Sequence, residues 1–334
     1  MGGSAGSVQP LVQIVRDLPS DLAAAVLVTI HVGEQTRLPQ ILSRSGPLPA
    51  VHVREREVLE QGRIYIAPPG QHLFARGGLA LVSPSPRVNR HRPAVDVMFA
   101  SAVEWAAGRT VAVVLSGALD DGAVGAALVA QAGGQVLIQD PAEAEFASMP
   151  RSALAAAPGA RAVSVRQLAH QIRDSVDLAR SLQSDAVQYY ATGPDMDMVE
   201  SEDPGYIRAD ESRLSRLSCP DCGGGMAQVD LPQISYFRCH VGHQFAPQAL
   251  AAAQAEASET KLWGAVAAVE EQAAVLRYMQ RRVSVRSQAT LPGQDQIQSA
   301  QERYAEEVAS RAIALRTQVR EWSSHPPQLD TLPE

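Results

Sequence analysis

Continuous apolar runs of strand length are the feature that most limits what this chain can fold into. The run "AAVLVTIH" ends at His31, "TVAVVL" covers residues 110–115, and "QVLI" covers residues 135–138. Strands that are apolar at every position, rather than at alternate positions, are typical of parallel sheets, because helices cover both faces of such sheets. These runs therefore predict buried parallel strands.

Helical segments separate these runs along the chain. The segments with helical periodicity are residues 8–19, 95–108, 122–134 and 165–182. Two further strand candidates are "RIYI", which is stopped by prolines, and "HLFARGGLALV", which predicts a hairpin that turns at Gly77 and Gly78. Alternation of strands with helices of about 12 residues indicates an α/β domain with a doubly wound, mostly parallel sheet over residues 1–182.

The N-terminal sequence "GGSAG" fits the G-x-S-x-G pattern of a nucleophile elbow, with Ser4 at its centre. Such an elbow lies between a buried strand and a helix. A helical segment follows the motif here, but no apolar strand precedes it, so we expect the first strand of the sheet to be truncated. A tight turn or a phosphate cradle at a helix N-terminus is the alternative interpretation of this motif.

Polar side chains also stand where two of the predicted strands end. His31 closes the run "AVLVTIH", and Asp120 and Asp121 follow "VAVVLSGAL". Sites in open parallel sheets form beyond the carboxyl ends of the strands. A hydroxyl, an imidazole and a carboxylate in that place are the parts of a Ser-His-Asp triad, in which the imidazole takes the serine proton and the carboxylate orients the imidazole. Taken singly, such residues are more often a tight turn, a structural histidine or a helix cap, and it is their joint placement at strand ends that favours the triad.

Residues 2–180 resemble the catalytic domain of the chemotaxis protein-glutamate methylesterase family, CheB. The resemblance rests on "GGSAGS", "TIHVGE", "NRHRPAVDVMFASAVEWAAGRTVAVVLSGALDDGAVG" and "AQAGGQVLIQDPAEAEFASMPRSAL". It implies a doubly wound parallel sheet and hydrolysis of γ-glutamyl methyl esters on the cytoplasmic helices of methylated chemoreceptors, with release of methanol. Deamidation of receptor glutamines is a further activity that the resemblance allows.

The resemblance also implies roles for individual residues. By motif position, Ser4 matches the nucleophile, His31 the general base and Asp121 the carboxylate that orients the base. The backbone N–H groups of Ala5 and Ala118 match the oxyanion hole. The family often has threonine and methionine at these two positions, so only backbone donors are expected here.

Full-length proteins of this family have two parts that are not found among these 334 residues. They are the buried strand before the elbow and the receiver domain. We expect either a translation start upstream of Met1 or a degenerate enzyme, and no phosphorylation control within this chain. The alternative function is a catalytically weak or inactive signalling scaffold that binds receptor or partner proteins. The loop Arg90–Arg92 is expected either to meet an acidic receptor surface or to cap the helix that follows.

The cysteines form a second motif. Cys219 and Cys222 are separated by two residues, and Cys239 and His243 follow after a spacer of the length found in zinc ribbons. We expect these four residues to hold a structural Zn²⁺, with His240 as the alternative fourth ligand. Adjacent side chains rarely point the same way, which favours His243 as the partner of Cys239. A reduced cysteine cluster without metal is the other interpretation.

The C-terminal half is expected to contain four further segments. They are an acidic linker at 183–214, a zinc-ribbon-like segment at 215–247, a helical hairpin at 248–322 and a disordered tail at 323–334. Apolar residues at steps of three and four predict the seam of the hairpin: Leu262, Val266, Val269, Ala273 and Leu276 on the first helix, and Tyr304, Val308, Ala312, Leu315, Val319 and Trp322 on the second. Partner docking or self-association is expected of this hairpin.

Charge and composition restrict the partners. The net charge of −7 argues against nucleic acid as a partner, because phosphate binding needs an excess of Lys and Arg. No apolar run reaches about 18 residues, so no membrane insertion is expected. There is no secretory signal pattern, and three cysteines do not suggest a disulfide framework. We therefore expect a cytoplasmic protein without a catalytic cofactor.

Overall fold

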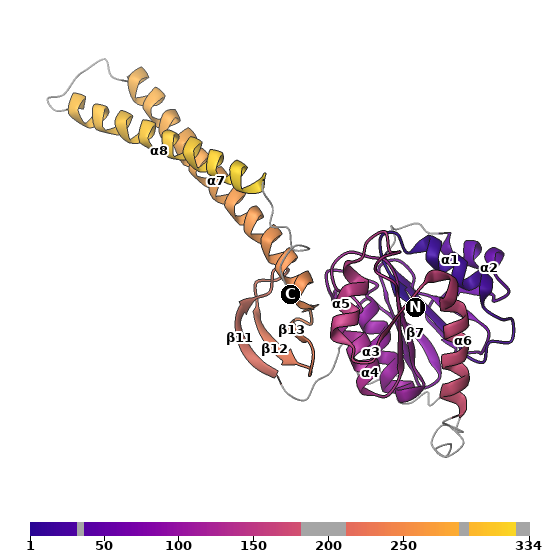
Figure 1. Cartoon of the computed structure of the whole chain (residues 1–334). Helices are drawn as coiled ribbons and strands as arrows, with labels where there is room; N and C mark the ends of the chain where they lie inside the picture. Colours follow the sequence, from indigo (N-terminus) through magenta and orange to yellow (C-terminus); the bar gives the residue numbers. More distant parts are fainter. Residues whose placement is uncertain (32–36, 182–211, 287–293, 325–334) are drawn as a thin grey trace. The chain divides into compact units, whose positions relative to one another are not determined.

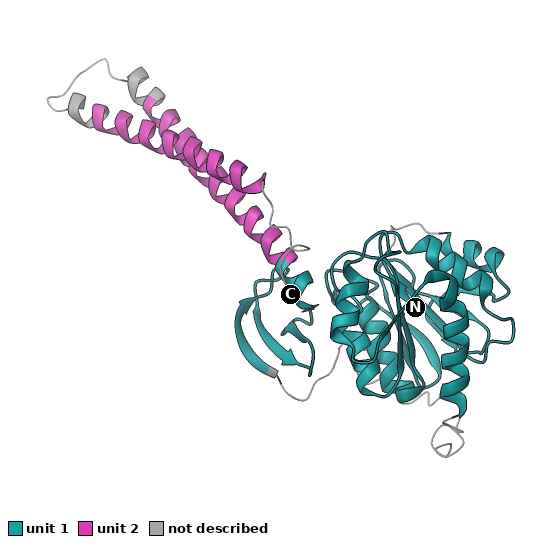
Figure 2. Ribbon diagram, in the orientation of Figure 1, with its two compact units in different colours: residues 1–251 teal, residues 252–334 magenta. Residues whose placement is uncertain are grey.

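The computed structural model describes residues 1–31, 37–181, 212–286 and 294–324. These residues divide into two compact units, 1–251 and 252–334, which Figure 2 shows in separate colours. The first unit contains the α/β sheet and the segment with the cysteines. Most of the expected linker at 183–214 and of the expected tail at 323–334 lies outside the described residues. The structure describes only residues 212–214 of the linker and residues 323–324 of the tail.

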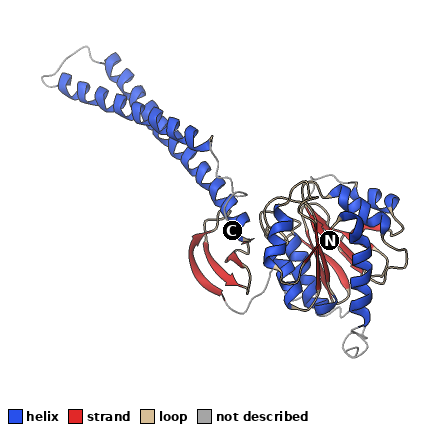
Figure 3. Cartoon of the chain, in the orientation of Figure 1, coloured by secondary structure: helices blue, strands red, loops and turns tan. Residues whose placement is uncertain are grey.

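A seven-stranded sheet forms the centre of the first unit. In spatial order its strands are β10 (Arg161–Val163), β9 (Gln135–Gln139), β8 (Val111–Val114), β1 (Gly2–Gly3), β2 (Val26–Ile30), β5 (Ile64–Ile66) and β3 (Ala50–His52). Every pairing is parallel. From β1 the chain moves outward on one side through β2 and on the other through β8. The predicted doubly wound parallel sheet is therefore confirmed (Figure 3).

Helices cover both faces of this sheet (Figure 1). One face carries α1 (Val8–Asp17), α2 (Leu38–Ser45) and α6 (Val165–Ser181), and the other carries α3 (Val95–Ala106), α4 (Ala123–Gln131) and α5 (Ser148–Ala156). A short 3₁₀ turn, η1 (Ala107–Arg109), follows α3. Each layer has its own buried cluster, with Ile14 and Leu42 in the first and Phe99 and Met149 in the second. This covering of both faces is why the strands are apolar throughout.

The first strand is short, as expected, but it is not missing. Gly2 and Gly3 pair with β2 on one side, and Gly2 pairs with β8 on the other. The N–H of His31 donates to the carbonyl of Gly3 at 3.1 Å, and the N–H of Ser4 donates to the carbonyl of Ser116 at 2.9 Å. Two paired residues therefore anchor the elbow in the centre of the sheet, where the sequence showed no apolar strand before it.

Several short elements were not expected from the sequence. They are α2, α5, β3, β10 and β4 (Arg56–Val58). The predicted hairpin is confirmed as β6 (His72–Arg76) and β7 (Leu79–Ser83), which pair antiparallel, and β4 adds a third strand beside β7. The missed strands have only three residues each, too few for a period of two to show.

The amino group of Met1 is buried between β2 and β8. It donates to the carbonyl of Leu27 at 2.7 Å, and burial lowers its pKa from 8.0 to about 5. Met1 also lines a pocket of about 330 Å³, together with Val111 and Ile172. Because the neutral form is favoured only in the folded state, the unfolded chain binds one more proton between pH 5 and pH 8.

In a chain prepared to begin at Met1, folding stability should therefore rise with pH across this window. A shift of three pKa units corresponds to about 4 kcal/mol between pH 5 and pH 8. Urea unfolding at several pH values measures it, and the matched control is a chain with three valines engineered before Met1. Subtracting the control's free energy of unfolding at each pH removes the contribution of every other titrating group. Identical profiles for the two chains would contradict a buried amine at Met1.

A small antiparallel sheet contains the cysteines. Its strands, in order, are β11 (Ser212–Ser218), β12 (Gly225–Asp230), β13 (Ser235–Cys239) and β14 (Gln244–Phe245). Tyr236 and Ala246 of this segment form a buried cluster with Ala100 of α3 and Val124 of α4. The small sheet therefore packs against the α3–α4 side of the first unit.

Two long helices follow, α7 (Pro247–Arg286) and α8 (Gln294–Ser323). Their contacts run in opposite directions along the two helices: Glu270 pairs with Arg316 at 2.5 Å, and Gln280 donates to the carbonyl of Gln301 at 3.1 Å. This confirms C-terminal helices in an antiparallel arrangement. Within the described ranges, no helix combines the length and the apolar content needed to cross a bilayer.

Of the eleven predicted seam residues, five are buried, four are half-buried and two are exposed. Val266, Ala273, Val308, Ala312 and Val319 are buried. Tyr304 and Trp322 were also predicted in the seam, and they are 47% and 41% exposed. Ala305, next to Tyr304, is buried in its place. The small alanine lets the helices approach closely, and the large rings remain partly in solvent.

Candidate active site and metal cluster

His31 and Asp121 meet at the carboxyl ends of two strands. His31 follows β2 and Asp121 follows the loop after β8, so residues 90 positions apart are brought into contact. Nε2 of His31 and Oδ2 of Asp121 are 2.8 Å apart. Both side chains are buried, with 8% and 2% of their surface exposed. An imidazole held in this way by a carboxylate can act as a general base.

The side chain of Asp121 lies at the N-terminus of α3. Its Oδ2 accepts the backbone N–H of Val95 at 2.7 Å, and its Oδ1 accepts the N–H of Asp96 at 3.2 Å. Burial acts to raise the pKa of Asp121, but the hydrogen bond and charge of His31, with the Val95 N–H, outweigh it and hold that pKa well below its ordinary value. The helix dipole also favours a negative charge here. Asp121 is therefore ionised beside His31.

Ser4 occupies the turn between β1 and α1. The N–H of Ser7 donates to the carbonyl of Ser4 at 3.1 Å, which closes the turn. Gly6 adopts a φ of +74°, and a Cβ there would lie 2.7 Å from Oγ of Ser116. This position therefore requires glycine for both its backbone and its close approach. The G-x-S-x-G sequence thus forms a strand–turn–helix elbow with the serine at its tip.

Strand pairing places Ser4 next to His31. Gly3 and Ile30 are register partners in β1 and β2, and Ser4 and His31 are the next residue on each strand. Neighbouring strands lie about 4.8 Å apart. Nδ1 of His31 is buried and has no hydrogen-bond partner among the described residues, while Nε2 is held by Asp121. Nδ1 is thus the ring nitrogen that is available to a serine hydroxyl.

Ala5 and Ala118, the predicted oxyanion positions, lie on neighbouring loops and are both exposed. The carbonyl of Ala5 accepts Oγ–H of Ser116 at 2.8 Å, which ties the elbow to the loop after β8. A Cβ on Gly117 would lie 2.9 Å from Cβ of Ser4, so this loop approaches the serine closely. The two backbone N–H groups remain predicted oxyanion donors.

A second histidine, which was not predicted as part of the site, lies against the first. The rings of His31 and His91 stack with centroids 3.6 Å apart and planes inclined by 12°. Burial, and then the charge of His31, lower the pKa of His91 to about 4, so the ring is neutral at physiological pH. A neutral stacked ring fixes the plane of His31 without repelling a proton on it.

The structure corrects one of the two expectations for the Arg90–Arg92 loop, that it caps the following helix. Arg92 donates through Nη1 to the carbonyl oxygens of Pro84 and Ser85, at 2.7 and 2.9 Å. The first N–H groups of α3 are capped by Asp121, not by this loop. Its middle residue, His91, instead covers His31. No spacing rule in the sequence links positions 31 and 91.

Sequence reasoning also missed Asn89 and Asp96, which complete a buried network around Asp121. The side-chain amide of Asn89 donates to Oδ2 of Asp96 at 2.8 Å and to Oδ1 of Asp121 at 2.9 Å. Oδ1 of Asp96 accepts the N–H of Gly125 at 2.7 Å. Burial, and then the charge of Asp121, raise the pKa of Asp96 well above its ordinary value. Of these two buried carboxyl groups, Asp96 is therefore the one that takes up a proton more readily.

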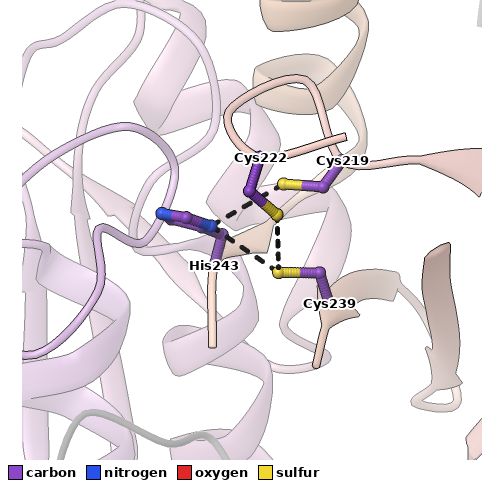
Figure 4. Close-up of side chains that lie close together, drawn as sticks. All are labelled: Cys219, Cys222, Cys239 and His243. Carbon is purple, nitrogen blue, oxygen red and sulfur yellow. Dashed lines mark hydrogen bonds between the residues drawn. The ribbon is translucent and has the colours of Figure 1, made fainter. Parts of the chain in front are cut away.

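A cluster of three thiols and one imidazole lies in the small antiparallel sheet (Figure 4). The four potential ligand atoms of Cys219, Cys222, Cys239 and His243 all lie within 4.8 Å of one another. The Cys222–Cys239 sulfur distance is 3.7 Å, and Nδ1 of His243 lies 3.8 and 3.6 Å from the sulfurs of Cys219 and Cys239.

These spacings match the edges of a zinc tetrahedron. Zn–S bonds of about 2.3 Å and Zn–N bonds of about 2.05 Å give S···S edges of about 3.8 Å and S···N edges of about 3.6 Å. The alternative ligand His240 is exposed and lies against Gly224, where a Cβ would be 2.4 Å from its ring. The residues present therefore fit a closed, four-coordinate metal site.

Comparisons with known proteins agree with this geometry. The family model described as CheB methylesterase matches residues 1–172. A protein from Leptospira interrogans with the provisional name protein-glutamate methylesterase/protein-glutamine glutaminase is 33% identical over 159 residues, which are 47% of this chain and 82% of that protein. The protein-glutamate methylesterase/protein-glutamine glutaminase of Bordetella pertussis is 35% identical over 181 residues, 52% of this chain and 51% of that protein.

One solved structure is also among the similar proteins. The CheB methylesterase catalytic domain of Thermotoga maritima is 28% identical to this chain and has a TM-score of 0.49, covering 52% of this chain and 95% of that one. The matched residues 1–172 contain the elbow, His31 and Asp121. On the family model and the Leptospira relative together, the chain belongs to the CheB methylesterase family.

Proposed function

We propose that this protein is a serine hydrolase that removes methyl esters from γ-glutamyl residues of chemoreceptors. The observation that carries the proposal is the buried His31–Asp121 pair, which stands beside the Ser4 elbow at the strand ends of a CheB-type domain. A scaffold that only binds would not require an ionised carboxylate buried against an imidazole. The hydrolase is therefore the better supported function.

In the proposed reaction, Oγ of Ser4 attacks the ester carbonyl and its proton passes to Nδ1 of His31. Asp121 stabilises the imidazolium through Nε2. The N–H groups of Ala5 and Ala118 would bind the oxyanion. The proton then moves to the leaving oxygen, and methanol departs. Water deprotonated by His31 hydrolyses the acyl-serine, which restores the hydroxyl and leaves a glutamate carboxylate.

We further propose that the substrate is presented by the cytoplasmic helices of a methylated chemoreceptor, so that the protein acts in the cytoplasm. The related proteins are named for glutaminase as well as methylesterase activity, and the same acyl-serine chemistry would release ammonia from a glutamine amide. The family assignment and the relatives' names support both activities.

We also propose that Cys219, Cys222, Cys239 and His243 hold a structural Zn²⁺. Four protein ligands leave no open position for water or substrate, which is the arrangement of structural rather than catalytic zinc. The proposed hydrolysis therefore uses no metal.

A serine-directed phosphonate tests the proposed reaction. Incubation should attach one phosphonate per chain to Ser4, located by peptide mass spectrometry, and should reduce methanol release from methylated receptor membranes in proportion to labelling. Ser45, a half-buried serine of α2, should stay unlabelled and serves as the internal control. Methanol release that persists at full labelling would reject Ser4 as the nucleophile.

A further inference from the structure

The side chain of Asn89 joins the small cysteine-containing sheet to the candidate active site. On the side of the small sheet, the N–H of Asn89 donates to the carbonyl of Gln244 in β14 at 2.7 Å, and its Oδ1 accepts the N–H of Ala246 at 2.6 Å. On the other side, its amide nitrogen donates to Asp121 and Asp96. Asn89 is only 2% exposed, so water does not replace these bonds.

The backbone conformation at position 89 also favours asparagine. Its φ of 52° lies in the left-handed region, which asparagine tolerates better than most residues. The neighbouring Val88 forms a parallel bridge with Gln244 and an antiparallel bridge with His91. The loop that carries Asn89 and the stacked His91 is thus pinned to β14 by backbone as well as side-chain hydrogen bonds.

A second link joins the same two parts of the chain. The carboxylate of Asp120 accepts the N–H of Gln248 at 2.7 Å and the N–H of Ala249 at 3.0 Å, both in the first turn of α7. Burial raises the pKa of Asp120 to about 6. Asp120 directly precedes Asp121, so this helix start is fixed one residue from the candidate catalytic carboxylate.

The metal cluster adjoins this contact. His243, one of the four cluster residues, directly precedes Gln244, and its carbonyl accepts the N–H of Cys239 at 3.0 Å. A metal at the cluster would hold His243 relative to Cys239 and so fix the place of β14. Only Gln244 and Asn89 lie between the cluster and Asp121. His243 is followed by Gln244, which contacts Asn89, and Asn89 contacts Asp121.

We propose that this metal-stabilised sheet is a positioning element of the active site, which acts on Asp121 through Asn89. The proposal rests on the proposed hydrolase function. Asn89 is a positioning residue and touches no substrate. Its amide orients the ionised carboxylate of Asp121 toward His31 and separates it from Asp96. If Asn89 is lost, or β14 is released, Asp121 keeps its helix cap but loses one of the two donors to its Oδ1.

A double-mutant cycle in the full chain tests this coupling. The variants are Asn89→Gly, which keeps the left-handed backbone, Cys222→Ser, which removes an exposed cluster residue, and the two combined. The matched control is His240→Ala, an exposed neighbour of Cys239 outside the cluster. The readouts are kcat and KM for methanol release, zinc content, and the downfield proton resonance of the His31–Asp121 hydrogen bond.

We expect each single variant to lower kcat by about 10- to 100-fold with KM within about twofold, because a hydrogen bond to a charged group is lost while substrate contacts remain. The combined variant should lose no more than the worse single variant, since both act through one link. The proton resonance should shift in all three, and the control should keep its zinc, its kcat and its resonance.

Three outcomes would overturn the proposal: losses that multiply in the combined variant, a resonance unchanged in Asn89→Gly, or a resonance unchanged in a Cys222→Ser chain shown to have lost its zinc. The resonance does not depend on turnover. If the wild-type chain releases no methanol, the proposed function fails, and the resonance still decides whether the small sheet orients Asp121.

Discussion

Replacement of Asp121 by asparagine is expected to lower the rate of methyl-ester hydrolysis by about 10⁴-fold. The carboxylate accepts from His31, Val95, Asp96 and Asn89, two donors to each oxygen. An amide has only one acceptor atom, so its NH₂ group must face two of these donors. If it faces Nε2 of His31, it favours the tautomer that carries a proton on Nδ1, and that nitrogen cannot accept the proton of Ser4.

The variant also removes a charge from the N-terminus of α3, so a loss of stability accompanies the loss of rate. Asp140→Asn is the matched control, because Asp140 follows β9 at the same edge of the sheet and caps only the N–H of Ala142. Steady-state methanol release measures the rates, and urea unfolding shows that both chains are folded. A folded Asp121→Asn chain within tenfold of the wild-type rate would exclude Asp121 as the orienting carboxylate.

The parallel sheet could be predicted because its signal is local. The runs that became β2, β8 and β9 are apolar at every position, and the helices between them have clear periodicity. Positions His31, Asp120 and Asp121 followed from the rule that parallel sheets carry their sites at strand ends, and the choice of Asp121 over Asp120 came from the family resemblance. The short elements α2 and β10 could not be predicted, because three to eight residues give too few positions for a period.

The surroundings of Asp121 could not be predicted from spacing. Asn89, His91 and Asp96 lie close together in the sequence, but their partners at 31, 121 and 244–246 depend on how three separate segments pack. Asp96 in the first turn of a helix is indistinguishable from an ordinary cap in the sequence. The roles of these residues depend on long-range contacts, which no local pattern encodes.

The cysteine ligands were more accessible to prediction because their chemistry is tied to spacing. The short separations Cys219–Cys222 and Cys239–His243 each place two ligand atoms on one turn, and pairing of β12 with β13 brings the two turns together. What the spacing did not show is that the strand after His243 reaches the loop beside the active site. That contact depends on the packing of the small sheet against α3 and α4.

Removal of metal is expected to unfold the small sheet while the parallel sheet stays folded. The segment from β11 to β14 buries few large apolar side chains, among them Met226, Tyr236 and Phe245. A core of this size does not stabilise so short a segment on its own. Structural zinc contributes about 10 kcal/mol or more to such domains, so the metal should decide whether this one folds.

Hydrogen exchange after chelation measures this effect. Amides of β12 and β13 should lose their protection, those of β8 and β9 should keep theirs, and zinc analysis should give one ion per chain before treatment. Cys219→Ser should reproduce the chelated state, whereas His240→Ala should retain its zinc and its protection. Protected β12 and β13 amides in a chain shown to be free of metal would mean that apolar packing alone maintains the sheet. In that case, the fixed position of β14 beside Asn89 would have to come from its contacts with α3, α4 and Asp120 rather than from the cluster.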